Sequence, residues 1–135
     1  MLRTIACVAS LAGALLLAAP AAAAPKTAGS SSIQLAQPSL ATASVASWPR
    51  YGDSVTFDIS TNETAYPYVH LACYQGRDLV GQSWKGFFNG ALGDRMFGLS
   101  SPIWTGGAAD CTGSLVTFVN GRWKSLASTS FHVEA

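Results

Sequence analysis

Apolar and polar residues alternate along several short stretches of this chain, and turn-forming residues separate the stretches. Residues 54–60 show the pattern most clearly, because Val55, Phe57 and Ile59 occupy every second position among polar neighbours. A period of two places successive side chains on opposite faces of a β-strand. The pattern therefore predicts half-buried strands, and no stretch of helical periodicity persists in the body of the chain.

The predicted strands recur about every dozen residues, which is typical of an all-β sandwich. They cover residues 33–37 continued by 40–44, then 54–60, 68–75, 79–84, 95–99, 110–119 and 122–133. Pro38 interrupts the first strand, as suits a strand at the edge of a sheet. Val69, Leu71 and Cys73 form the inward set of the strand over 68–75, and Asn120-Gly121 predicts a two-residue hairpin turn.

The N-terminus carries a different pattern. Arg3 precedes an uncharged apolar run over residues 5–19, and small residues follow at 21–24. This order is typical of a secretory signal peptide, and the run is short for a membrane span. We expect residues 1–24 to form a cleaved signal-peptide helix, residues 25–32 a flexible linker and residues 33–135 the folded domain. The alanine-rich leader is of a bacterial style.

The sequence also bears on what happens after export. A lipoprotein signal needs a cysteine directly after a tract such as Leu11-Ala12-Gly13, but Ala14 stands there. No second apolar segment follows. We therefore expect a secreted protein, extracellular or periplasmic, that is soluble and has no membrane anchor after signal cleavage.

Charge is sparse and balanced. The chain holds eight Lys and Arg against seven Asp and Glu, and charged residues make up 11% of it. Without a basic patch or a charge run, electrostatic capture of nucleic acid or anionic lipid is not expected.

No motif predicts an active site or a metal centre. His70 and His132 lie on separate predicted strands, with no third ligand at metal-binding spacing. The chain has no G-x-S-x-G elbow, and Asp58, Asp94 and Asp110 are isolated carboxylates. We expect no catalytic residue, no metal and no cofactor.

Four stretches resemble the strands of an immunoglobulin-like domain. Residues 51–59 (Tyr-Gly-Asp-Ser-Val-Thr-Phe-Asp-Ile) look like its B strand, and residues 73–80 look like its C strand, turn and C′ strand. Residues 106–112 resemble the approach to its F strand, and Asn120-Gly121 would form its F–G hairpin. The resemblance covers about residues 45–133 and implies a Greek-key β-sandwich of about seven to nine antiparallel strands.

The departures from that family point to an unusual disulfide. Ile59 stands at the B-strand Cys position, so the bridge of antibody domains is excluded. Cys111 matches the F-strand Cys position and Cys73 the C-strand Trp position. The resemblance places these strands side by side, and Cys7 leaves with the signal peptide. The resemblance therefore implies a disulfide between Cys73 and Cys111. By loop-closure entropy this bond would stabilise the folded state by about 4 kcal/mol.

Aromatic residues carry the functional expectation. Tyr68, His70 and Tyr74 share the outward parity of one predicted strand, and Trp84 follows on the next. We take these four as the candidate binding face, because exposed aromatic clusters mark interfaces or sugar platforms. The alternative is that Trp84, Phe87 and Phe88 turn inward and complete the core or cover an edge of the sheet.

The sequence thus predicts a non-catalytic, immunoglobulin-like module that recognises a protein or a cell surface. A second copy of the chain is among the partners considered. One alternative is a carbohydrate-binding module that uses exposed aromatic rings. Another is a small secreted hydrolase, inhibitor or toxin whose site the sequence does not reveal.

Overall fold

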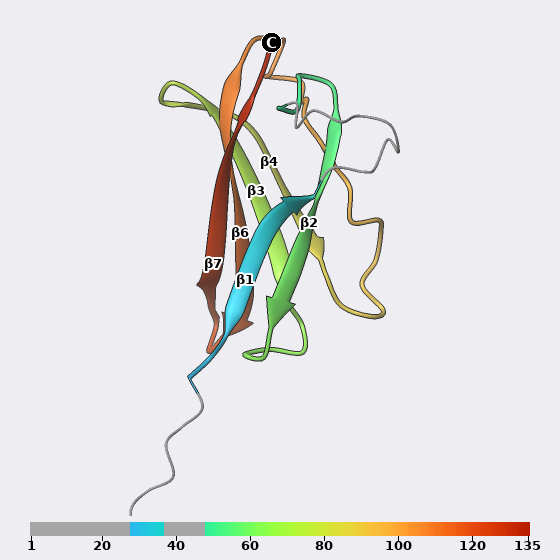
Figure 1. Ribbon diagram of the computed structural model, residues 1–135, viewed down its shortest axis with the longest axis vertical. Helices are drawn as coiled ribbons and strands as arrows, with labels where there is room; N and C mark the ends of the chain where they lie inside the picture. The colour runs from blue at the N-terminus through green and yellow to red at the C-terminus, as the bar shows by residue number, and fades with distance from the viewer. Residues whose placement is uncertain (1–27, 37–47) are drawn as a thin grey trace, which may run out of the picture.

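The computed structural model describes residues 28–36 and 48–135, and within them the chain forms two antiparallel β-sheets and no helix (Figure 1). The strands are β1 (Ser31–Ala36), β2 (Ser54–Thr61), β3 (Tyr68–Gln75), β4 (Asp78–Gly86), β5 (Phe97–Gly98), β6 (Ala109–Val119) and β7 (Arg122–Val133). One sheet has the order β1-β2-β5 and the other the order β4-β3-β6-β7. The all-β class that the alternating pattern predicts is confirmed.

Tight turns connect the strands of the four-stranded sheet. Asn120 and Gly121 both have positive φ, of 51° and 74°, which is the backbone of a type I′ turn. This turn pairs Val119 with Arg122 and sets the register of the long β6–β7 hairpin. Gly76 closes the turn between β3 and β4 with a positive φ of 63°, which glycine adopts readily because it has no Cβ.

Two predicted strand ranges differ clearly from the structure. β1 begins at Ser31, inside the segment 25–32 expected to be a linker, because the Ser31 hydroxyl hydrogen-bonds to Thr61 and Glu63. Of the strand predicted over 95–99, only Phe97–Gly98 pairs with β2, since the Thr56 hydroxyl occupies the Arg95 carbonyl. The expected continuation over 40–44 and the signal peptide lie outside the described residues.

The core fills the space between the two sheets. The inward sets predicted for β2 and β3 are confirmed, with Val55 and Phe57 buried on one side and Val69 and Leu71 on the other, while Ile59 is partly buried against them. β6 contributes a glycine at an inward position. A Cβ on Gly113 would lie 2.4 Å from the Phe57 ring, so the absence of a side chain there makes room for that ring.

The disulfide between Cys73 and Cys111 is confirmed. The two residues face each other on β3 and β6 with their Cα atoms 4.0 Å apart, and both side chains are buried. The bond closes a separation of 38 residues within the four-stranded sheet. It therefore ties the middle of the chain to the β6–β7 hairpin.

A tryptophan from a loop completes the core beside this disulfide. Trp104 follows β5 and is only 1% exposed. Its indole N–H donates to the Gly107 carbonyl at 3.1 Å, and its own carbonyl accepts from the Tyr51 hydroxyl at 2.8 Å. Trp104 thus anchors the Gly-rich loop that the sequence marks before β6.

Candidate functional site

Aromatic side chains gather on the outer face of the four-stranded sheet. Because β-strand residues alternate between faces, the residues of β3 that flank the buried set point away from the core. Their neighbours across the sheet add further rings from β4, from β6 and β7, and from the loops that flank β3 and β4. We call this cluster the aromatic face; it consists of Tyr66, Tyr68, His70, Trp84, Phe88, Phe118 and Trp123.

Trp123 is the centre of the aromatic face. Its ring centroid lies 5.4 Å from that of Tyr68, 4.8 Å from Trp84 and 5.1 Å from Phe118. Trp84 in turn stacks on His70, with centroids 4.0 Å apart and an interplanar angle of 21°. The rings therefore form one continuous contact network from β4 across to β7.

The aromatic face is open to solvent. Four of its members keep large exposed fractions: Tyr66 65%, Phe118 57%, Trp123 48% and Trp84 44%. Val116 of β6, which lies on the same face, is buried. The cluster therefore covers part of the sheet while presenting several large rings to water, an arrangement that marks interaction surfaces.

His70 is an imidazole held in a partly dry place within this cluster. Burial lowers its pKa below the ordinary value of 6.5, and a hydrogen bond with the Gln82 side chain opposes that shift. The Nε2 atom is buried and has no hydrogen-bond partner in the part of the chain that the structure describes. Burial therefore favours the neutral form of this ring.

The structure brings together three of the four residues proposed from the sequence. Tyr68, His70 and Trp84 all belong to the aromatic face, whereas Tyr74 lies toward the other end of β3, opposite Leu79 and Asp110. Tyr74 is 41% exposed but makes no ring contact with the cluster among the described residues.

The alternative expectation for Trp84, Phe87 and Phe88 holds for one residue only. Phe87 turns inward, and its ring centroid lies 6.3 Å from that of Phe97. Phe88 packs edge-on against Tyr68 on the outer face. Trp84 also stays outside. The order of residues after β4 therefore divides the pair of phenylalanines between the two faces.

Sequence reasoning missed Tyr66, Phe118 and Trp123. A signal for two of them was present, because a two-residue Asn-Gly turn places the residues before and after it in cross-strand pairs. Phe118 accordingly pairs with Trp123. Which face this pair occupies depends on the β3–β6 register, and that register joins residues distant in the sequence.

Hydroxyl groups cover the rest of the outer face on β6 and β7. Thr112 and Ser130 are hydrogen-bonded across the two strands at 3.1 Å. Next to them, the Asp110 carboxylate and the His132 Nδ1 atom are 2.8 Å apart, with both side chains well exposed. Among the described residues, no hydroxyl group hydrogen-bonds to the His132 ring. The same residues contain no group of three or more His, Cys, Asp or Glu side chains arranged to hold a metal ion.

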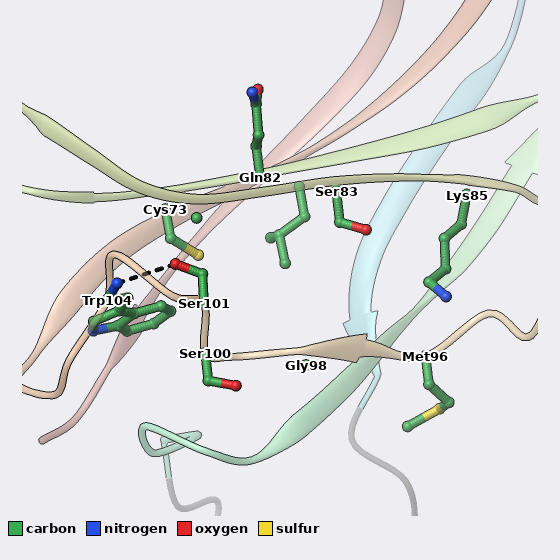
Figure 2. Close-up of a pocket in the computed structure, with 11 residues that line it drawn as sticks. Cys73, Gln82, Ser83, Lys85, Met96, Gly98, Ser100, Ser101 and Trp104 are labelled. Atoms are coloured by element: carbon green, nitrogen blue, oxygen red, sulfur yellow. Dashed lines mark hydrogen bonds between the residues drawn. The ribbon is translucent and has the colours of Figure 1, made fainter.

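A polar cavity of about 300 Å³ lies between the edges of β4 and β5 (Figure 2). Ser83 and Lys85 point into it from β4, Ser100 and Ser101 lie across from them, and Cys73 is at its floor. The Lys85 ammonium pairs with Asp94 at 2.7 Å, and this contact together with the Met96 N–H lowers the pKa of that carboxyl. The cavity lies between the two sheets, at edges of β4 and β5 that pair with no further strand among the described residues.

Comparison with known proteins gives no assignment. No protein-family model, no curated protein and no solved structure matches the chain. Within residues 28–36 and 48–135, there is no helix of the length and apolarity that crossing a membrane requires.

Proposed function

We propose that this chain is a secreted, non-catalytic, immunoglobulin-like recognition module that binds a partner protein through the aromatic face. The observation that carries the proposal is the exposure of Tyr66, Trp84, Phe118 and Trp123 in one contiguous cluster on a sheet. Large aromatic residues of this kind dominate the energetics of protein interfaces. The neighbouring hydroxyl rows would supply the polar rim.

The strand order supports the immunoglobulin-like part of the proposal. In that fold one sheet holds strands A, B, E and D and the other holds strands C, F and G, with C′ added beside C in the variable type. The orders β1-β2-β5 and β4-β3-β6-β7 correspond in sequence order to A-B-E and C′-C-F-G, with no counterpart of D among the described residues. The Cys73–Cys111 bond joins the strands that would be C and F, and it suits an oxidising compartment such as the one a secreted protein enters.

Ring geometry favours a protein partner over a carbohydrate. A sugar platform needs ring faces that lie open and nearly coplanar, whereas Tyr68 meets Phe88 at 67° and Trp123 at 79°. One face of Trp84 is occupied by His70. This cluster exposes ring edges more than ring faces. The side chains of another protein would pack against such an uneven surface better than a flat sugar ring.

The test compares variants of the aromatic face with matched variants elsewhere. Immobilised wild-type protein is incubated with the extracellular proteins and surface proteins of its host, and bound proteins are identified by mass spectrometry. We expect one partner to be retained by wild type and lost when Trp123→Ala and Phe118→Ser are combined. Ile103→Ser is the control, because Ile103 is 68% exposed and not part of the cluster.

Two outcomes would overturn the proposal. A partner that binds the double variant as well as wild type would place the binding surface elsewhere. Retention on an insoluble neutral polysaccharide, lost in the double variant and kept in Ile103→Ser, would establish the carbohydrate alternative instead. Circular dichroism of each variant shows whether its sheets are intact.

A further inference from the structure

One edge of the four-stranded sheet has no partner strand in the described part of the molecule. β4 pairs with β3 alone, and β5, which lies across the polar cavity, pairs with β2 alone. Since β5 is two residues long, it leaves most of the nine-residue β4 edge open. An open edge presents a row of N–H and C=O groups to any extended chain that approaches it.

The structure shows which backbone groups of β4 face this open edge. The Phe87 N–H donates to the Pro67 carbonyl at 2.9 Å, so position 87 is a hydrogen-bonded position of the β3–β4 pair. Hydrogen-bonded positions alternate along an antiparallel pair, so Lys85 and Ser83 also face β3. The N–H and C=O groups of Gln82, Trp84 and Gly86 therefore point away from β3.

The edge of β4 is covered on the N-terminal side of Gln82, at Val80. From Gly81 to Gly86 the edge carries little charge. The Ser101 hydroxyl donates to the Val80 carbonyl, which closes that end of β4. Lys85 is the single charged residue from Gly81 to Gly86, and Asp94 neutralises it. Proline is one of the residues that protect an open edge, and this stretch has none.

We propose that a second copy of this chain pairs with the open edge, β4 against β4 across a two-fold axis. A strand that is antiparallel to its own copy is self-complementary, which is the requirement of an isologous dimer. A register centred on Trp84 places it opposite Trp84 of the second copy and Gln82 opposite Gly86. Every outward-facing group from Gln82 to Gly86 is then used, in about six main-chain hydrogen bonds.

Charge and shape agree with this register. It places Lys85 opposite Ser83 of the second copy, so the two ammonium groups do not face each other directly. Trp84, which is 44% exposed, gains an aromatic neighbour. The two aromatic faces come to lie on the same side of one continuous sheet, so the dimer uses Trp84 and leaves Tyr66, Phe118 and Trp123 of each copy open to a partner protein.

The expected dimer is reversible. A stable interface buries about 800 Å² on each partner. Pairing of five residues along one edge, with a single tryptophan pair, buries less than that. The association should therefore depend on protein concentration across the micromolar range rather than persist at every dilution, as is usual for interfaces at the small end of the range.

Gln82→Pro is the decisive variant. Proline removes the Gln82 N–H, which faces the open edge, and it is tolerated on edge strands whose N–H faces solvent. Gln82→Ala is the matched control, since it removes the same side chain and keeps the N–H. We expect sedimentation equilibrium to show a monomer–dimer equilibrium for wild type and Gln82→Ala, and at least a tenfold weaker association for Gln82→Pro.

Hydrogen exchange gives a second measurement that needs no variant. The Trp84 amide should exchange more slowly as wild-type concentration rises, while the Ile103 amide should not change. A monomer at all concentrations, or a dimer that Gln82→Pro leaves intact, would overturn the proposal. Trp123→Ala separates it from the proposed recognition function, because that variant should lose the partner protein and keep the dimer.

Discussion

Gly113 offers the sharpest test of how the two sheets pack. It lies at an inward position of β6, and a Cβ added there would approach the Phe57 ring to 2.4 Å and 2.6 Å at two of its carbons. The ring cannot move aside easily, because it packs edge-on against Phe97 at 5.4 Å and lies 6.2 Å from Phe131. Gly113→Ala should therefore force the sheets apart or push Phe57 off its rotamer.

The magnitude follows from two opposing effects. Overpacking of a tight core costs about 1–3 kcal/mol. Replacing glycine by alanine in a strand recovers about 0.5–1 kcal/mol, because the unfolded chain loses conformational freedom. We expect a net loss of about 1–2 kcal/mol in the free energy of unfolding. At about 4–8 °C per kcal/mol for a domain of this size, the melting temperature should fall clearly.

Urea unfolding followed by tryptophan fluorescence measures this loss as a lower midpoint at unchanged slope. Gly98→Ala on β5 is the matched control, since nothing lies within 4 Å of a Cβ at that position. Combining Gly113→Ala with Phe57→Leu should cost less than the sum of the single changes, by about 1 kcal/mol. A midpoint for Gly113→Ala equal to or above wild type, or strict additivity in the double variant, would refute the packing argument.

Three other expectations concern the disulfide, the buried imidazole and the hairpin. Replacing Cys73 and Cys111 together by alanine should lower the free energy of unfolding by about 4 kcal/mol, measured by urea unfolding, and dithiothreitol should affect wild type alone. Because burial lowers the pKa of His70, its neutral form is favoured by folding; stability is complete above 6.5 and is lost as pH falls through that value toward the folded pKa. Midpoints at about pH 7.5 and about pH 5 should differ less in His70→Phe than in wild type. Asn120→Ala should lower the melting temperature by several degrees, roughly 1 kcal/mol, because it forces a Cβ without side-chain support into positive φ; an unchanged value would argue against the type I′ turn.

The local pattern was sufficient for the strands whose two faces differ. In β2 and β3 apolar residues alternate with polar or aromatic ones, so both the strand and its buried side could be predicted. The hairpin turn was equally readable, because Asn-Gly has few alternatives between two strands. The pairing of Cys73 with Cys111 needed the resemblance to a known fold as well, since spacing alone does not determine which strands are neighbours.

The aromatic face shows where sequence reasoning stops. The structure places Tyr68, His70 and Trp84 in one cluster, and their proximity could be predicted because they lie on strands joined by one turn. Trp123 was missed because its place beside Tyr68 depends on the pairing of β3 with β6, across a separation of dozens of residues. Tyr74 lies toward the other end of β3 from the cluster, and shared parity says which face a residue occupies but not how far along the strand the neighbours extend.

The core is complete without the aromatic face, and this argues that the cluster has a role other than folding. Trp104, Phe97 and the disulfide already close the interior between the sheets, with each of these side chains almost fully buried. The outer rings add contacts with one another, yet Trp123 and Phe118 still leave about half of their surfaces in water. Serine or threonine in place of Phe118 and Trp123, as elsewhere on the outer face of β6 and β7, would have kept the hairpin without exposing large apolar rings to water. The exposed rings therefore support the proposed recognition function, in which a partner protein would remove them from water.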